Sequence, residues 1–394
     1  VPADLTCSYF VHPFDKDPDN WVEARNSRFA KEWELASLEE LASFKEHKVL
    51  QLVPRQVAVD SGKRIYKPRP VFKIKVKPPS VTNPEPTIDR FKFRQTIGAF
   101  VRTMVKGVDY QEKRSSNVRW EGYLVKLSAA VQYDLDLTLV DIKSFFLAGD
   151  LPPSDVVFME QPPEWDPRYP SFAYVCRLMR SMYGLPQAPH CAQPKLRDTI
   201  LANKSFRQTT ADDCIFVSGS PTDEGFVAVG THVDDLLTVS TPLGLSKFVT
   251  TLQKVFTITV KRDPEIVVGV QIVRNRKAGW LKLHQAAYID SILDTFGLTE
   301  CHSEKTPLNH STVQQLMILP LATKETADPG VQCQYRRLVG MLIWLYKTRP
   351  DMLFTVNLLA RFLPTATKAH LTLALGRPLR YLKGSRTRGL VFVR

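Results

Sequence analysis

Two adjacent aspartates between two apolar runs constrain this sequence more than any other feature. Residues 226–233 are largely apolar, Asp234 and Asp235 follow, and residues 236–239 are largely apolar again. This order predicts a β-hairpin with both acids at its tip. Because neighbouring side chains on a strand point to opposite faces, the two carboxylates can serve one site only where the backbone turns sharply.

Neighbouring carboxylates in an apolar setting repel each other and resist the loss of water, so a cation beside them is expected. A hard divalent ion with oxygen ligands is the natural candidate. A solvated Asp-Asp turn is the common alternative for so short a motif. A third acid favours the metal site, because the largely apolar residues 137–140 lead directly into Asp141. A strand-end Asp with a hairpin Asp-Asp is the arrangement of polymerases in which two metal ions clamp the attacking and leaving oxygens.

Three motifs extend this comparison. Residues 141–151 read D-I-K-S-F-F-L-A-G-D-L, residues 181–189 read S-M-Y-G-L-P-Q-A-P, and residues 232–235 read H-V-D-D. They resemble D-V-K-T-A-F-L-N-G-D-L, S-L-Y-G-L-K-Q-A-P and Y-V-D-D in the reverse transcriptase region of copia-type LTR-retrotransposon Pol polyproteins. The resemblance runs from about Trp33 to the last residue.

The resemblance implies an α/β (α+β) fold, a right-hand polymerase with fingers, palm and thumb subdomains. We expect five segments on this basis: an N-terminal helical extension (1–47), the fingers (48–140), the palm with the catalytic hairpin (141–270), the primer grip and thumb (271–332), and a helical segment (333–394) that leads toward a ribonuclease H domain. The acids that would open that domain are not reached, so its chemistry is expected to be absent.

The implied activity is RNA-directed DNA polymerisation, with Mg²⁺ as cofactor and Mn²⁺ as a possible substitute. By resemblance, Asp141, Asp234 and Asp235 would be the catalytic residues. The same three carboxylates, with the backbone carbonyl of Ile142, would bind the metal. Nucleotidyl transfer by positioning and charge neutralisation needs no covalent enzyme intermediate.

A basic β-hairpin is predicted upstream, because apolar residues and Lys alternate in 71–77 and residues 90–94 read R-F-K-F-R. A similar hairpin in the family contacts the incoming triphosphate, so Lys92 and Arg94 are the phosphate-binding candidates, since cations stabilise charge on the transferring group. A solvated basic edge strand is the alternative. The resemblance also implies that Phe146 excludes a ribose 2′-OH by its volume and that Gln187 contacts the nucleotide. It assigns three residues to primer and template: His232, Val233 and Lys282.

Several positions depart from the family pattern. Residues 97–100 lack the Lys of A-K-G-F, residues 114–117 are polar where the family is apolar, and residues 190–194 replace R-A-W-Y. His232 replaces a Tyr, and a metal-ligand role for it is disfavoured because Mg²⁺ prefers oxygen. Phe145, where the family has Ala, could lie in the core or crowd Phe146. Two rival functions stay open: a degenerate, non-catalytic nucleic-acid-binding remnant and a two-metal nuclease.

Charge and composition narrow the partners. The 53 Lys and Arg residues against 40 Asp and Glu residues give a net charge of +13. Such an excess suits a polyanion, because neutralised phosphates release counterions, although solubility alone is an alternative. The six cysteines form no Cys-x-x-Cys pair, so reduced intracellular thiols are expected. The longest apolar run, near 338–346, is shorter than the ~18 residues that a membrane span needs, so no membrane partner is expected.

The resemblance names the remaining partners: an RNA or DNA template with a DNA primer, dNTPs, and flanking integrase and ribonuclease H segments of a parent polyprotein. The chain begins with Val1 rather than Met, and we expect it to be cut from something longer. A cytoplasmic location in retrotransposon particles is implied.

Apolar spacing predicts several helices. Residues 32–46 carry apolar residues at helical intervals, and this helix is expected to serve packing. A second helix is expected to start at Tyr335, and a third to carry Leu353, Val356 and Leu359. Residues from about 309 to 330 are expected to form a polar link.

Overall fold

The computed structural model describes residues 16–77, 87–98, 104–113, 115–163 and 165–394. The chain divides into two compact units, which are described separately. Unit 1 comprises residues 1–117, 142–204 and 251–257, and unit 2 comprises residues 118–141, 205–250 and 258–394. Both units combine helices with strands, so the expected α+β class is confirmed.

Unit 1 contains a two-stranded ribbon, a four-stranded sheet and several helices. The ribbon pairs β3 with β4, and the sheet has the order β1-β7-β6-β2. The strands of unit 1 are β1 (Leu50–Pro54), β2 (Ile65–Tyr66), β3 (Pro68–Lys77), β4 (Thr87–Ile97), β6 (Phe158–Met159) and β7 (Tyr174–Leu178). Its helices are α1 (Trp21–Asn26), α2 (Ala30–Glu46), α3 (Arg55–Asp60), α5 (Ala188–Leu201) and the short 3₁₀ helix Phe145–Ala148.

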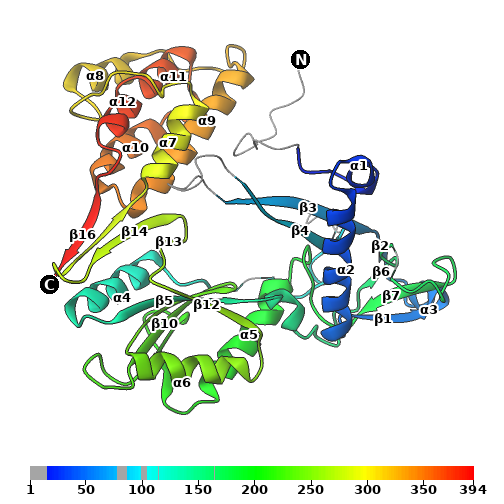
Figure 1. Ribbon diagram of the computed structural model, residues 1–394. Helices are drawn as coiled ribbons and strands as arrows, with labels where there is room; N and C mark the ends of the chain where they lie inside the picture. The colour runs from blue at the N-terminus through cyan, green and yellow to red at the C-terminus, as the bar shows by residue number, and fades with distance from the viewer. Residues whose placement is uncertain (1–15, 78–86, 99–103, 114, 164) are drawn as a thin grey trace. The chain divides into compact units, whose positions relative to one another are not determined.

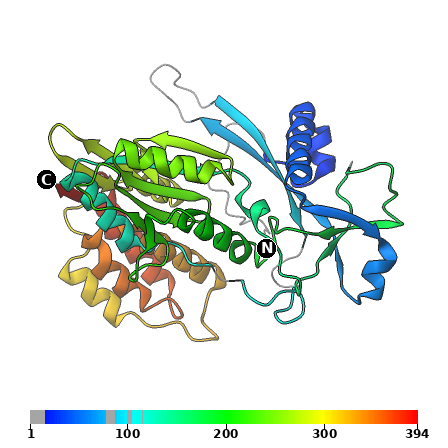
Figure 2. The same cartoon turned by 90° about the horizontal axis from the view of Figure 1, so that it is seen from below.

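The helix α2 packs against β4 of the ribbon, which it crosses in Figure 1 and lies beside in Figure 2. Its Trp33 is 1% exposed and lies edge-on to Phe72 and Phe91, with ring centroids 5.2 and 4.8 Å away. The predicted helix and the predicted alternation of the ribbon are therefore confirmed, since the apolar residues Phe72 and Ile74 are buried. Such aromatic packing fixes the helix on the ribbon.

Unit 2 is built on a six-stranded sheet of order β12-β5-β11-β10-β9-β8. Its strands are β5 (Asp136–Ile142), β8 (Phe206–Gln208), β9 (Ile215–Ser218), β10 (Val227–His232), β11 (Asp235–Ser240) and β12 (Ile258–Arg262). The predicted hairpin is β10 and β11, which pair antiparallel. The helix α4 (Trp120–Gln132) packs against both hairpin strands, and α6 (Pro242–Gln253) follows the hairpin.

A second sheet of unit 2 has the order β13-β14-β15-β16. It is formed by β13 (Ile266–Val267), β14 (Val270–Asn275), β15 (Trp280–His284) and β16 (Gly389–Val393). The remaining elements are α7 (Ala286–Thr295), α8 (His310–Ile318), α9 (Pro329–Ile343), two 3₁₀ helices (Trp344–Lys347 and Pro350–Met352), α10 (Leu353–Ala360), α11 (Lys368–Leu375) and α12 (Arg377–Gly384).

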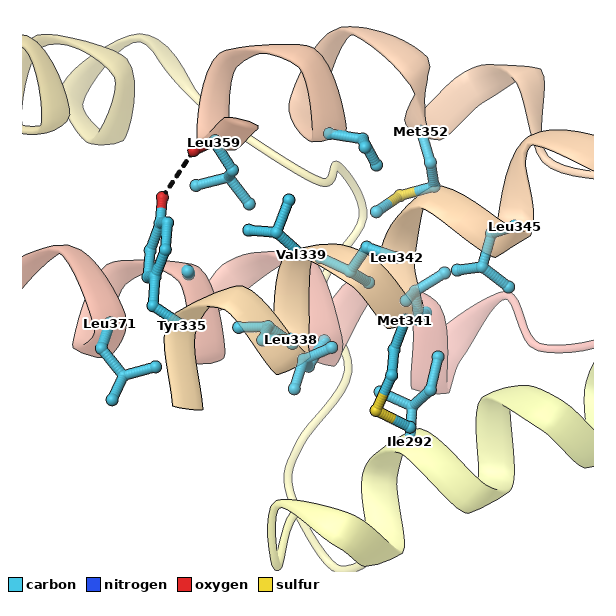
Figure 3. Close-up of a cluster of buried hydrophobic side chains, with 14 of the residues drawn as sticks. Ile292, Tyr335, Leu338, Val339, Met341, Leu342, Leu345, Met352, Leu359 and Leu371 are labelled. Carbon is cyan, nitrogen blue, oxygen red and sulfur yellow. Dashed lines mark hydrogen bonds between the residues drawn. The ribbon is translucent and has the colours of Figure 1, made fainter. Parts of the chain in front are cut away.

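Helices α7 to α12 enclose one apolar core (Figure 3). Tyr335 is fully buried at its centre, and its hydroxyl donates to the carbonyl of Leu359 at 2.9 Å. The expected polar link was wrong, because α8 lies within it and Asn309 caps α8 by accepting from the Thr312 N–H. The helix expected at Tyr335 begins earlier, at Pro329, since Asp328 caps its first turn.

No described helix combines the length and the apolar character needed to cross a membrane. The five cysteines that the structure describes are free thiols, which agrees with the expected reduced state. Cys7 lies outside the described residues.

Candidate active site

The turn between β10 and β11 is as tight as the sequence requires. His232 pairs with Asp235, which leaves only Val233 and Asp234 between the strands. Val233 has a φ of 57°, in the left-handed region that a β-branched residue rarely adopts. Backbone strain of this kind persists only where the surrounding structure holds it, and it is common at functional sites.

Strand register brings the third acid to the same end of the sheet. Asp235 on β11 is the direct partner of Asp141 on β5, and directly opposed residues have Cβ atoms about 5 Å apart. Asp141, Asp234 and Asp235 are all half-buried, and the adjoining Ile142 is 1% exposed. The three predicted acids are therefore neighbours, although they come from segments about ninety residues apart in the sequence.

The electrostatics of this cluster favour a cation. Burial, together with the charges of Asp234 and Asp141, raises the pKa of Asp235 to about 6. The charges of Asp234 and Asp141 thus oppose the ionisation of Asp235. The donor set is made of oxygen atoms, as hard divalent ions require, so the residues fit Mg²⁺ or Mn²⁺.

A tighter acidic group, not expected from the sequence, lies elsewhere in unit 2. The ligand-type atoms of Asp212, Asp213 and Cys214 lie within 4.8 Å of one another, whereas the three predicted acids form no group this tight among the described residues. In this Asp212–Cys214 group, the oxygens of Asp212 already accept from the backbone N–H groups of Arg119 and Cys214, each at 2.9 Å. Burial raises the pKa of the Cys214 thiol to about 12. The group is therefore better explained as a backbone cap than as a Mg²⁺ site.

His232 lies beside the acids and is also affected by the charge of Lys347. Burial lowers its pKa, and the charge of Lys347 lowers it further while Asp234 opposes the shift. Lys347 is 5% exposed, donates to the Val268 carbonyl at 3.3 Å, and lies 3.6 Å from the ring centroid of Trp344. Within the described chain, the Nδ1 atom of His232 is buried and has no hydrogen-bond partner. The imidazole is thus held neutral next to the hairpin tip.

In unit 1, two other predicted residues, Arg94 and Phe146, both contact the ring of Tyr183. The guanidinium carbon of Arg94 lies 5.0 Å from the ring centroid of Tyr183, and the Phe146 ring meets the same Tyr183 edge-on at 5.8 Å. The Ile97 N–H donates to the Tyr183 carbonyl at 3.0 Å. Gly184 has a φ of +92°, and a Cβ atom there would lie 2.8 Å from the Ile97 carbonyl. Only glycine therefore lets this loop approach β4 so closely.

The other predicted residues are placed differently. Lys92 is half-exposed on β4 opposite Lys73, and Lys282 is half-exposed on β15 between Val273 and Val391. Gln187 is fully buried, with its Nε2 atom 3.5 Å from the Asp109 carbonyl. Its Oε1 atom is buried without a hydrogen-bond partner in the part of the chain that the structure describes. Sequence reasoning did not include Tyr183, although it lies inside the quoted S-M-Y-G-L motif.

Comparison with known proteins agrees with this geometry. A family model described as reverse transcriptase (RNA-dependent DNA polymerase) matches residues 66–310, which is more than half of the chain. The retrovirus-related Pol polyprotein from transposon TNT 1-94 of Nicotiana tabacum is 29% identical over 379 residues, covering 96% of this chain and 27% of that protein. The corresponding polyprotein from transposon RE1 of Arabidopsis thaliana is 31% identical over 310 residues, covering 78% and 20%.

The chain thus spans about a quarter or less of the length of these curated relatives. The family match covers the ribbon β3–β4, both sides of the hairpin and all three predicted acids. The resemblance to retrotransposon Pol polyproteins is confirmed, and the chain belongs to the reverse transcriptase (RNA-dependent DNA polymerase) family.

Proposed function

We propose that this chain is an RNA-directed DNA polymerase that extends a DNA primer with dNTPs. The observation that carries the proposal is the meeting of Asp141, Asp234 and Asp235 at one end of the six-stranded sheet. Burial and the repulsion among these carboxylates raise the pKa of Asp235, and bound divalent ions would relieve the repulsion. Polymerisation uses such a cluster to neutralise charge on the primer oxygen and the triphosphate.

The chain's own residues would orient the reactants. The three carboxylates, with the Ile142 carbonyl, would hold Mg²⁺, and Mn²⁺ would be accepted by the same oxygens. When bound, the ions would supply Lewis-acid activation of the primer 3′ oxygen and charge neutralisation. Lys92 and Arg94 would bind the triphosphate, Phe146 would exclude a 2′-OH group, and Gln187 would contact the nucleotide. Three residues would contact primer and template: His232, Val233 and Lys282.

The proposed right-hand architecture follows the five sequence segments. Fingers (48–140) would carry the ribbon, the palm (141–270) the acids, and primer grip and thumb (271–332) the sheet around β15. The extension (1–47) would precede them in the sequence, and the final helices (333–394) would follow them. One adjustment is proposed: α4 packs on β10 and β11, so it would belong with the palm. Template RNA or DNA, flanking integrase and ribonuclease H segments, and a location in cytoplasmic retrotransposon particles complete the proposal.

Primer extension on an RNA template tests the function. We expect the unaltered chain to extend oligo(dT) on poly(rA) with dTTP and Mg²⁺. Asp234→Asn should reduce extension by roughly 10³-fold, as expected when stabilisation of developing charge is lost. Asp213→Asn is the matched control, because it removes the same charge from the Asp212–Cys214 group and should leave extension intact.

Two other outcomes would contradict the proposal, the first its activity and the second its metal site. If neither form extends the primer while both bind the template in a salt-dependent way, the chain is a non-catalytic nucleic-acid-binding remnant. If Asp213→Asn abolishes extension and Asp234→Asn does not, the ions are held by the Asp212–Cys214 group and not by the three predicted acids.

A further inference from the structure

A half-buried carboxyl lies on the helix that packs against the strand of the predicted triphosphate-binding residue Arg94. Glu40 is on α2, the helix whose packing covers β4. The Gln95 backbone N–H hydrogen-bonds its carboxyl, whereas its Oε1 atom is buried and has no hydrogen-bond partner among the described residues. Burying half of a carboxyl group without a partner is costly, so its position needs a reason.

Arg94 offers that reason. Its Nε atom is likewise buried without a hydrogen-bond partner within the described chain, and its guanidinium lies over the Tyr183 ring at 5.0 Å. Among charged groups, Arg94 acts most strongly on Glu40, and Lys92 acts next. Two half-buried groups of opposite charge, each with one buried atom that has no hydrogen-bond partner among the described residues, are thus electrostatically coupled between α2 and β4.

We propose that Glu40 is a positioning residue for Arg94: its carboxylate and the Tyr183 ring together hold the guanidinium ready for the triphosphate of an incoming nucleotide. This inference rests on the proposed polymerase function. It gives the helix α2 a role beyond packing, because Glu40 lies on the helix that packs against the strand carrying Arg94.

The coupling has a pH signature. Burial raises the pKa of Glu40 to about 7, although Arg94, the Gln95 N–H and Lys92 all lower it. Below that pH the carboxyl is neutral and Arg94 loses its counter-charge, and above it the carboxylate is present. We therefore expect Arg94 to be better ordered, and triphosphate binding tighter, on the alkaline side.

Other charged groups near α2 are already engaged. On α1, Glu23 interacts with Asn20, and Arg25 lies over the Trp21 ring at 5.5 Å. At the end of α2, the His47 ring bonds the Ser43 carbonyl at 2.9 Å. A His47→Gln variant separates any contribution of this ring to the pH dependence from that of Glu40.

The test compares KM for dTTP in the unaltered chain and in Glu40→Gln, which keeps the shape but stays neutral. The ratio of the two KM values cancels the ionisation of the triphosphate itself. We expect the KM of Glu40→Gln divided by the KM of the unaltered chain to be near one at about pH 6 and roughly 5–10 at about pH 8. The kcat should change little, because the lost interaction would bind the ground state and the transition state equally. Glu39→Gln, an exposed neighbour on the same helix, should give a ratio near one at both pH values.

A ratio that stays near one at about pH 8, or a Glu40→Gln variant that binds dTTP more tightly, overturns the inference. Binding of dTTP without primer, measured by calorimetry, keeps it testable if no extension occurs. In that assay the alkaline gain in affinity should be present in the unaltered chain and absent from Glu40→Gln and Arg94→Ala. A chain that shows this gain but extends no primer refutes the polymerase and keeps the role of Glu40. If Glu40→Gln does not fold, equal pH dependence in the unaltered chain and Arg94→Ala overturns the role.

Discussion

The acid cluster of unit 2 and the Arg94–Tyr183–Phe146 cluster of unit 1 are assembled in different ways. The acids occupy one hairpin and the strand that pairs with it, so backbone hydrogen bonds fix their order. The unit 1 cluster joins a strand, a loop and a 3₁₀ helix through ring contacts at 5.0 and 5.8 Å. Ladder register is specified by alternation along the strands, whereas such side-chain contacts depend on tertiary packing.

Because of this difference, the two clusters should tolerate amino-acid substitutions to different extents. A one-residue slip in the hairpin would turn Asp235 away from Asp141 and destroy the site. The unit 1 cluster can lose one contact and keep the others. We therefore expect substitutions in unit 1 to weaken or broaden nucleotide binding rather than abolish chemistry.

The largest effect within unit 1 is expected from Arg94. Arg94→Ala should raise the KM for dTTP by roughly 10²-fold, because charge-assisted hydrogen bonds to phosphate are lost, with a smaller effect on kcat. Steady-state extension at varied dTTP measures it. Arg90→Ala removes an exposed cation from the same strand and should change KM little. An equal effect of both variants would mean that only the net charge of the ribbon matters.

A smaller effect is expected at Phe146. Phe146→Val should admit ribonucleotides and raise the UTP-to-dTTP incorporation ratio by roughly 10–100-fold, since a pocket of altered volume discriminates to about that extent. Phe145 is the informative control, because it is 3% exposed and part of the core. Phe145→Leu should lower the melting temperature and leave the sugar ratio unchanged. A changed ratio in Phe145→Leu alone would move the gate to the neighbouring ring.

The smallest effect concerns stability beneath the hairpin. Lys126 is 4% exposed, donates to the Leu237 carbonyl at 3.0 Å, and has its pKa lowered by burial to about 7. Because the unfolded chain binds this proton up to a higher pH, the unaltered chain should gain on the order of 1 kcal/mol of stability between about pH 7 and pH 9.

Chemical denaturation at the two pH values measures that gain. Lys126→Met should lose it, whereas Lys277→Met, which removes an exposed lysine, should retain it. A gain that persists in Lys126→Met would mean that another group titrates.

Features of the fold set by local patterns were predictable from the sequence. Apolar alternation and the Asp-Asp pair predicted β10, β11 and β5, and the helical spacing around Trp33 predicted α2. In each case the apolar residues that form the pattern become buried on folding, and the polar residues between them mark the turn.

Other features depend on information that a pattern does not carry. The short helix α8 was missed because Leu316 is its one buried residue, so its sequence shows no clear apolar face. The cap formed by Asn309 and the Thr312 N–H was the available signal. Tyr183 and Glu40 lay within recognised segments, but only tertiary packing places the Tyr183 ring against Arg94 and brings Glu40 under the electrostatic influence of Arg94. The Asp212–Cys214 group was overlooked because, in the sequence, acids that cap the backbone cannot be told apart from acids in a solvated turn.

Binding of Mn²⁺, followed by the loss of the free-ion paramagnetic resonance signal, tests most directly where the divalent ion is held. The account predicts that Asp234→Asn weakens Mn²⁺ binding by about 10-fold or more, as metal-site substitutions commonly do, and that Asp213→Asn binds Mn²⁺ like the unaltered chain. Unchanged binding in Asp234→Asn, with weakened binding in Asp213→Asn, would contradict the account and place the ion at the Asp212–Cys214 group.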